Sequence, residues 1–343
     1  MNIVDVRDKE LSVGIKGMGY YIPEKVVTNH DIEKIVDTTD EWIQSHTGIK
    51  ERHVCSSEQA ASDLAIEAAK RALENAKVKA EDIDLIIMTT LQPDNTDPLP
   101  CSLVQHKLGA KNAAAFNMSV GGCPDSMFSF VTACNYILSG SYKNVLLVNS
   151  EVNSKFINWE DRTMCIFFGD GAGAWVLQPV KKGCGLLGFT LGNDGSGHDV
   201  IHCDAGGSRI PITKEALEKG LQYPHMDGKK VFEFATKVFP QSIEELFQKL
   251  DMSKDDVNLF LAHQANYFII KKSLKKIGVG MDKTFTNIDK YGNMSSASVP
   301  VVLSQALEEN LIHGGDVITL TAFGAGLAWG SCIIRWPKKE DFI

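Results

Sequence analysis

A single cysteine, Cys123, stands where a turn between a strand and a helix would present it for nucleophilic chemistry. It lies in FNMSVGGCPDSMFSF, residues 116–130, where a short apolar run leads into two glycines and then into a helical apolar pattern. The glycines allow a tight turn, and Pro124 with Asp125 is typical of the first turn of a helix. The positive end of that helix would favour thiolate over thiol. The pattern predicts a nucleophile, although a lone cysteine is also common as a small buried apolar residue.

Two further residues, His263 and Asn293, have the types that would complete such a site. His263 follows the apolar run LFLA, so it lies where the carboxyl end of a buried strand meets the ligand-binding crevice of an α/β sheet. A thiol, an imidazole and an amide at one junction supply a nucleophile and two hydrogen-bond donors. We therefore expect these residues to form a catalytic site. The structural alternatives are a buried core histidine and, after Gly292, a turn asparagine.

The composition limits the classes of function. The 343 residues suffice for two domains or one large duplicated domain, and 44% apolar with 23% charged residues is typical of a soluble globular protein. A net charge of −8 argues against general nucleic-acid binding. The eight cysteines are scattered without a C-x-x-C pair, which disfavours a metal site and a disulfide framework. No apolar run reaches the roughly 20 residues of a membrane span, so we expect a cytoplasmic protein without membrane association.

Apolar periodicity predicts alternating strands and helices around the three candidate residues. Strands are expected at residues 11–21, 84–90, 113–118, 144–149 and 167–177, and helices at 62–76, 103–108 and 127–138. Ser62 is the expected cap of the first of these helices. The glycines of GDGAG introduce a strand and do not open a helix, so they do not predict a phosphate loop.

The second half of the chain repeats the first. Three pairs of segments share a pattern about half a chain apart: AEDIDLII with KDDVNLFL, LGAKNAAAFN with IGVGMDKTFTN, and SGSYKNVLLV with HGGDVITL. A constant offset is better explained by duplication than by chance. Cys123 and Asn293 each lie six positions after the asparagine that ends one of these segments, so they occupy equivalent turns. We expect two similar α/β halves, residues 1–184 with the cysteine and residues 185–343 with the histidine and the asparagine.

Several strings along the chain match the pattern of one enzyme family: DEWIQSHTGIKERH, the cysteine turn, NWEDR running on to FFGDGAGA, DGSGHD with AGGSR, AHQAN, YGNMSSASVP and FGAGLAWGS. On these strings the sequence resembles the β-ketoacyl-acyl-carrier-protein synthase III branch of the thiolase-like condensing enzymes, over nearly its whole length. The resemblance implies an α/β protein with a five-layer αβαβα thiolase-like fold of two duplicated halves, and a homodimer. It implies a decarboxylative Claisen condensation of an acyl thioester starter, acyl-coenzyme A or carrier-bound, with a malonyl-acyl carrier protein. The product would be a β-ketoacyl thioester, in fatty-acid initiation or in a specialised acyl or polyketide pathway.

The resemblance also assigns roles to individual residues. The catalytic triad falls on Cys123, His263 and Asn293, and the oxyanion hole falls on the backbone N–H groups of Cys123 and Ala325. The remaining implied roles are contacts with coenzyme A or pantetheine by Trp42, Arg162, Phe232 and Asn266, and a gate to the acyl pocket of the other subunit by Leu99. Separately from the resemblance, the basic charge of Lys271, Lys275 and Lys276 predicts that they dock the acidic carrier protein. Trp42 and Arg162 resemble the pair that holds the adenine between them. No metal or redox cofactor is implied, because the coenzyme A or phosphopantetheine thioesters are substrates.

The chain departs from the family pattern at three places. His46 stands where the family usually has an arginine near the phosphates of coenzyme A, and Phe268 stands where a basic docking residue is usual. Residues 124–126, Pro-Asp-Ser, replace the usual small residues after the nucleophile. These departures argue against a role restricted to starting fatty acids from acetyl-coenzyme A.

Two other functions are compatible with the same residues. One is an acyltransferase of the same fold, in which Cys123 passes its acyl group to an amine or an alcohol. The other is a dimeric scaffold or carrier-binding module with an inactive site, which the intact triad disfavours. Release of carbon dioxide from a malonyl-carrier would separate the condensing enzyme from both.

Overall fold

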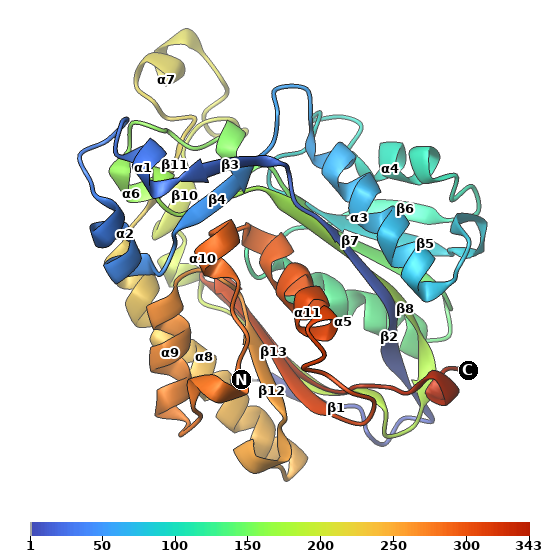
Figure 1. The fold of residues 1–343 in the computed structure, drawn as a ribbon. Helices are drawn as coiled ribbons and strands as arrows, with labels where there is room; N and C mark the ends of the chain where they lie inside the picture. Colours follow the sequence, from blue (N-terminus) through green and yellow to red (C-terminus); the bar gives the residue numbers. More distant parts are fainter. Residues whose placement is uncertain (1) are drawn as a thin grey trace.

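Two five-stranded sheets form the framework of the protein. The computed structural model describes residues 2–343, and Figure 1 shows the two sheets with helices between and outside them. The first sheet has the order β2 (Leu11–Tyr21), β8 (Gly171–Lys181), β7 (Val145–Glu151), β5 (Leu85–Thr89) and β6 (Ala114–Asn117). The second has the order β1 (Asn2–Asp5), β9 (Gly185–Asn193), β14 (Ala328–Arg335), β13 (Val317–Gly324) and β12 (Leu259–Ala262). The five strands expected from the sequence are all present within a few residues of their predicted limits.

The two sheets share one strand order, so the predicted duplication is confirmed. β9, β14, β13 and β12 take the places of β2, β8, β7 and β5, with matching parallel and antiparallel pairs. The place of β6 is taken in the second half by a single parallel bridge between Phe260 and Thr284. The chain passes from one sheet to the other between Lys181 and Gly185, and β1 joins the sheet of the second half. The domain limits given by the sequence, residues 1–184 and 185–343, stay a prediction.

The helices complete five layers, as the resemblance implies. α3 (Ala61–Ala76) and α4 (Cys101–Leu108) cover the outer face of the first sheet, while α8 (Gly228–Leu250) and α9 (Tyr267–Lys276) cover the outer face of the second. α5 (Asp125–Leu138) and α11 (Ser298–Glu308) lie between the sheets and contact strands of both. The order is therefore αβαβα. No helix of the described residues is long and apolar enough to cross a membrane.

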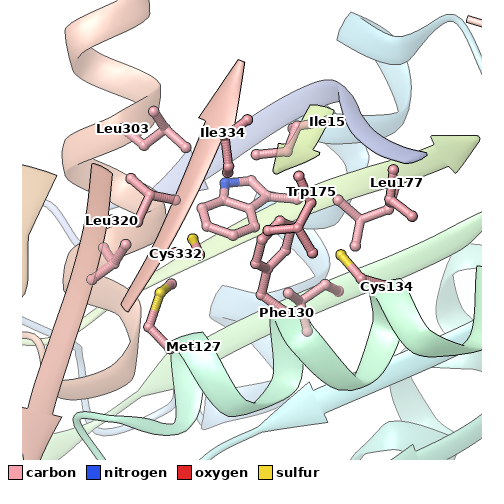
Figure 2. Close-up of a cluster of buried hydrophobic side chains, with 14 of the residues drawn as sticks. Ile15, Met127, Phe130, Cys134, Trp175, Leu177, Leu303, Leu320, Cys332 and Ile334 are labelled. Carbon is pink, nitrogen blue, oxygen red and sulfur yellow. The ribbon is translucent and has the colours of Figure 1, made fainter. Parts of the chain in front are cut away.

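The central layer packs around Trp175 of β8. Figure 2 shows its ring between Met127, Phe130 and Cys134 of α5 and Leu303 of α11. The three α5 residues recur at a spacing of three and four, so they form one stripe of the helix. The ring of Phe130 meets that of Trp175 edge to face, with centroids 5.4 Å apart, and Trp175 is completely buried. This packing sets the position of α5, and with it the turn that carries Cys123.

Glycines of β2 allow α3 to lie directly on the first sheet. A Cβ on Gly17 would lie 2.3 Å from the backbone nitrogen of Ala76, and one on Gly19 would lie 2.4 Å from that of Ala72. The expected serine cap of α3 is wrong. The helix begins at Ala61 after the N-cap Ala60, whose backbone N–H is bound by Asp63. The hydroxyl of Ser62 instead donates to a carboxylate far along the chain, that of Asp94, which sequence spacing could not reveal.

The remaining elements gather beside the two sheets at the end where the candidate residues lie (Figure 1). They are the strand pairs β3 (Lys25–Thr28) with β4 (Glu51–Val54) and β10 (Ile201–Cys203) with β11 (Pro224–Met226), and the short helices α1 (Asn29–Ile32), α2 (Asp40–Thr47), α6 (Arg162–Cys165), α7 (Lys214–Glu218) and α10 (Ile288–Tyr291). β11, α6 and the segment after α10 each contribute side chains to one cavity, which is described below.

Replacement of Gly17 by alanine tests the contact between β2 and α3. The added methyl group would meet helix backbone, which cannot rotate away as a side chain can, so we expect a loss of about 2–3 kcal/mol in the free energy of unfolding. Denaturant titration followed by circular dichroism measures it. Gly207→Ala is the control, because a Cβ there meets no atom within 4 Å. Equal midpoints for the two variants would contradict the direct contact.

Candidate active site

Cys123 lies in the turn between β6 and α5, as the sequence predicts. Gly121 and Gly122 have φ angles of +128° and +103°, which residues with a side chain rarely adopt. A Cβ on Gly122 would also lie 2.6 Å from Cδ1 of Leu91. The two glycines are therefore needed both for the backbone path and for the space around it.

The carboxylate of Asp125 holds this turn together. It accepts hydrogen bonds from the backbone N–H groups of Val120 at 2.6 Å and Gly122 at 3.3 Å, and from the hydroxyl of Ser119 at 2.8 Å. Burial raises the pKa of Asp125 to about 6, against the opposite effect of these hydrogen bonds. The carboxylate stands at the N-terminus of α5, so it takes up part of the positive field that we expected to act on Cys123.

The expectation that Cys123 is a thiolate is wrong for the protein without substrate. Burial raises the pKa of Cys123 to about 12, whereas the hydroxyl of Ser295 acts to lower it. The carboxylates of Glu151 and Asp125 act in the same direction as burial, because a second negative charge nearby is unfavourable. The sulfur is thus a thiol at neutral pH. The sequence predicts the helix start that would lower the pKa of Cys123, but it does not reveal the burial of the sulfur that raises this pKa.

His263 follows β12 and is completely buried. Burial lowers its pKa to about 3, so the ring is neutral. Neither ring nitrogen has a hydrogen-bond partner among the described residues, and the ring meets that of Phe323 edge to face with centroids 5.6 Å apart. A neutral imidazole offers one N–H donor, and its low pKa makes it a poor base at neutral pH.

Asn293 has its amide oriented by the backbone. Its Oδ1 accepts a hydrogen bond from the N–H of Ser295 at 2.8 Å, which leaves the NH₂ group as the donor available to the cavity. Its backbone N–H donates to the carbonyl of Phe167 at 2.8 Å, and its carbonyl accepts from Gly169 at 3.0 Å. The turn before it depends on Gly292, whose φ is +63° and where a Cβ would lie 2.5 Å from that carbonyl oxygen of Phe167.

The structure brings the three predicted catalytic residues to one cavity of about 160 Å³ at the junction of the two halves. Cys123 comes from the first half, and His263 and Asn293 come from the second. Most of the wall is apolar, and it includes Leu91, Phe156, Ile157, Met164, Phe167, Phe168, Met226 and Val231. An enclosed apolar wall with a few convergent polar groups is the usual form of a small-molecule site.

The backbone of residues 324–325 lies directly against the nucleophile. A Cβ on Gly324 would lie 2.9 Å from Cβ and 3.5 Å from Sγ of Cys123. Ala325 lines the cavity and lies beside Gly121. The backbone that carries Ala325 thus lies beside the nucleophile, and an oxyanion hole formed by the N–H groups of Cys123 and Ala325 stays a prediction.

Phe232 and Asn266 line the same cavity, as expected for residues that contact a pantetheine arm. The amide of Asn266 is already engaged, because its Nδ2 donates to the carbonyl of His46 at 2.9 Å and its Oδ1 accepts from the N–H of Phe268 at 2.8 Å. Asn266 thus caps α9 and ties it to α2. A substrate that binds the Asn266 amide must therefore share its Nδ2 and Oδ1 atoms with these two partners.

Trp42 and Arg162 lie together but outside the residues that line the cavity. The guanidinium carbon of Arg162 is 4.7 Å from the centre of the Trp42 ring, and the ring of His46 stacks on Trp42 with centroids 4.1 Å apart. A base between two stacked groups needs about 3.5 Å on each side. Trp42 and Arg162 therefore have to separate before an adenine fits between them.

The remaining predicted site residues lie away from the cavity of this chain. Leu99 is 42% exposed on the segment before α4 and does not line the cavity, so a role as a gate would concern another subunit. Lys271 and Lys275 are exposed on α9. Lys276 donates to the carbonyl of Thr236 at 2.7 Å, so its ammonium group is partly engaged within the fold.

Three residues near the nucleophile were not assigned a role from the sequence. Gly324 and Ser295 line the cavity, and both belong to strings that carry the family resemblance. Glu151 ends β7, is completely buried, and accepts hydrogen bonds from the hydroxyl of Ser296 at 2.5 Å and the N–H of Leu91 at 3.1 Å. Burial raises its pKa to about 7. Its place at the carboxyl end of a buried strand was the available signal.

Comparisons with known proteins agree with this geometry. The family model described as 3-oxoacyl-[acyl-carrier-protein (ACP)] synthase III matches residues 116–195, and the model of its C-terminal part matches residues 247–336. A β-ketoacyl-[acyl-carrier-protein] synthase III from Caldanaerobacter subterraneus subsp. tengcongensis is 47% identical over 330 residues, which are 96% of this chain and 99% of that protein.

Solved structures show the same likeness. The crystal structure of 3-oxoacyl-[acyl-carrier-protein] synthase III from Aquifex aeolicus is 38% identical with a TM-score of 0.88, over 94% of this chain and 100% of that one. The priming β-ketosynthase from the R1128 polyketide biosynthetic pathway is 29% identical with a TM-score of 0.88, over 96% and 98% of the two chains. The expected fold class is confirmed by these likenesses.

The pH dependence of alkylation tests the raised pKa of Cys123. Only the thiolate reacts, so with a pKa of about 12 the rate of modification by iodoacetamide should rise about tenfold per pH unit between pH 7 and 9. Mass spectrometry of the peptide that contains Cys123 measures the rate, and Cys123→Ala identifies reaction at other cysteines. A rate that stays constant above pH 7 would show a thiolate already present.

Proposed function

The chain belongs to the 3-oxoacyl-[acyl-carrier-protein] synthase III family of condensing enzymes, and we propose that Cys123, His263 and Asn293 perform the condensation in it. The reaction joins an acyl thioester starter to a malonyl-acyl carrier protein, with loss of carbon dioxide, and gives a β-ketoacyl thioester. The observation that carries this proposal is the convergence of the three residues from both halves on one cavity, where the imidazole has no other partner and the amide presents its NH₂ group.

In the first step, the sulfur of Cys123 attacks the carbonyl carbon of the starter. The acyl group moves to the cysteine, and the proton of the Cys123 thiol ends on the departing thiol of coenzyme A or phosphopantetheine. The negative charge that develops on the carbonyl oxygen needs preorganised donors, for which we propose the backbone N–H groups of Cys123 and Ala325. Gly324 supports this step because only a residue without a side chain lets the two backbones approach so closely.

In the second step, the malonyl group loses carbon dioxide and becomes an enolate. We assign the stabilisation of the enolate oxygen to an N–H of His263 and the NH₂ of Asn293, since both are neutral donors. The enolate carbon then attacks the acyl group on Cys123. The sulfur leaves as thiolate and takes up a proton from solvent water, so the enzyme returns to its initial state.

We propose acyl-coenzyme A as the starter, with Trp42 and Arg162 on its adenine. Trp42 lies on α2 and Arg162 on α6, which also contributes Met164 to the cavity wall, and this location supports the assignment. The contact requires that the two side chains first move apart. The departures at His46 and Phe268 leave open a carrier-bound starter, as well as the choice between fatty-acid initiation and a specialised pathway.

We also propose a homodimer in the cytoplasm. β6 is the last strand of the first sheet and, within the described part of the chain, pairs with β5 alone, so a second copy could extend the sheet at its outer edge. Leu99 would then act on the cavity of the partner chain. The proposed chemistry uses no metal and no redox cofactor.

Asn293→Ala separates condensation from simple acyl transfer. An acyltransferase has no evident use for a second neutral donor beside His263, whereas the enolate needs one. We expect acylation of Cys123 to remain near the parent rate while carbon dioxide release and β-ketoacyl product fall roughly 100-fold or more, the scale of losing one oxyanion donor. Intact-protein mass spectrometry measures acylation, and labelled malonyl-carrier measures carbon dioxide.

Asn135→Ala, on an exposed position of α5, is the matched control for that variant and should behave as the parent. Condensation at the parent rate by a folded Asn293→Ala variant would remove the main reason to prefer carbon–carbon bond formation. The acyltransferase would then be the better explanation.

Charge reversal on α9 tests docking of the carrier protein. Carrier proteins are acidic, so exposed lysines raise the rate of encounter even on a protein of net charge −8. Lys271→Glu with Lys275→Glu should raise the KM for malonyl-carrier roughly 3- to 10-fold at low salt, with kcat unchanged and with a smaller effect at high salt. The same reversal at Lys143 and Lys182, which are exposed in the loops before β7 and after β8, is the control. Equal KM values for both pairs would indicate that the α9 lysines are only a solvated helix face.

A further inference from the structure

Ser295 has an unusual backbone conformation beside the nucleophile. It begins the short 3-10 helix η6 (Ser295–Ala297), two residues after Asn293, and its φ is +49°. Residues other than glycine rarely adopt such angles, and they persist where the surrounding structure holds them, often at functional sites. The conformation lets the backbone N–H of Ser295 reach Oδ1 of Asn293, while its side chain lines the cavity.

The hydroxyl of Ser295 is buried without a hydrogen-bond partner among the described residues. The residue is 2% exposed, and Oγ lies 3.3 Å from the point where a Cβ on Gly122 would sit, directly beside the residue that precedes Cys123. Its neighbours in the chain behave differently. The hydroxyl of Ser296 donates to Glu151, and that of Ser298 accepts from the N–H of Met294 at 3.2 Å.

An unpaired buried hydroxyl is unfavourable, and one that lines a cavity can be satisfied by a group that becomes charged there. The group that most lacks a donor there is the sulfur of Cys123, which must become anionic to react. Burial and two carboxylates oppose that charge, and Ser295 is the side chain that acts to lower the pKa of Cys123. In the proposed second step, His263 and Asn293 donate their hydrogen bonds to the malonyl substrate and not to the sulfur.

We propose that the hydroxyl of Ser295 donates a hydrogen bond to the sulfur of Cys123 whenever that sulfur carries negative charge. This inference rests on the proposed function. The charge is present when the thiolate attacks the starter and again when it leaves the acyl group during condensation. No proton is transferred, because the proton of the cysteine leaves with the departing thiol and the serine keeps its own. Once the sulfur is acylated and neutral, the hydrogen bond is released.

Two substitutions distinguish the hydroxyl from the strained backbone. Ser295→Ala and Ser295→Gly both remove the hydroxyl and both keep the backbone N–H that orients Asn293, but only glycine relieves the positive φ. We expect both variants to form the acyl-enzyme roughly tenfold more slowly than the parent at pH 7–8, the scale of a hydrogen bond to a charged group. The thiolate absorbance near 240 nm should appear at higher pH in both.

Release of carbon dioxide from malonyl-carrier by enzyme already acylated at Cys123 provides the internal comparison, because it no longer depends on the rate of acylation and because His263 and Asn293 stay in place. It should remain within about twofold of the parent, whereas a general disturbance of the site would lower it together with acylation. Ser304→Ala is the matched control. It removes another buried serine hydroxyl, which donates to the carbonyl of Pro300 on α11, and it should acylate as the parent does.

Three results would overturn the inference. The first is that Ser295→Ala acylates and titrates as the parent does. The second is that Ser295→Ala acylates slowly while Ser295→Gly acylates at the parent rate, and the third is an equal loss of acylation and carbon dioxide release. Failure of the proposed function would look different, because the unmodified enzyme itself would then release no carbon dioxide from malonyl-carrier.

Discussion

Exclusion of water from the junction between the two sheets is the constraint on which this site depends. α5 and α11 fill the space between the sheets with apolar side chains, and the cavity beside them has a mostly apolar wall. Charged forms are unfavourable there, so the pKa of Cys123 rises to about 12 and that of His263 falls to about 3. Both residues are held in their neutral forms. A site made of neutral donors suits the stabilisation of an enolate better than it suits general base catalysis.

Duplication explains how one fold presents different groups at equivalent places. Each half places a turn after the same strand position, and each turn depends on a glycine of positive φ, Gly122 before Cys123 and Gly292 before Asn293. At both glycines a side chain would collide with atoms from a distant segment. The fold therefore brings a distant segment of the chain close to the backbone at both Gly122 and Gly292. The residue that follows each glycine was free to acquire its own chemistry, a nucleophile in one half and a hydrogen-bond donor in the other.

Local patterns in the sequence were enough to predict the strands of the first sheet, the duplication and the three residues that meet in the cavity. Properties set by distant contacts were not. The cap of α3 was misassigned because Ser62 bonds to Asp94, and the predicted thiolate failed because the carboxylates of Asp125 and Glu151 and the loss of water are features of the folded chain. The hydrogen bond from Lys276 to the carbonyl of Thr236, on another helix, was likewise not visible in the sequence, and the docking role of Lys276 stays a prediction. Sequence spacing reports which residues share an element, but not which partners the fold supplies.

The polar groups around Cys123 divide according to whether the fold satisfies them. Asp125, Glu151 and Oδ1 of Asn293 all have hydrogen-bond partners, and each holds a turn or an orientation. Among the described residues, the fully buried polar side-chain atoms that line the cavity without a partner are the ring nitrogens of His263 and the hydroxyl of Ser295, and the NH₂ group of Asn293 also faces the cavity. Buried unsatisfied atoms also occur elsewhere, as at Nε1 of Trp175, so the lack of a partner does not by itself indicate function. The unsatisfied atoms of the cavity differ because the proposed reaction would bring partners to them: an enolate oxygen to the imidazole and an anionic sulfur to the hydroxyl. Their lack of partners in the resting protein lets them bind the developing charge without first breaking a hydrogen bond, which is the condition for preorganised electrostatic catalysis.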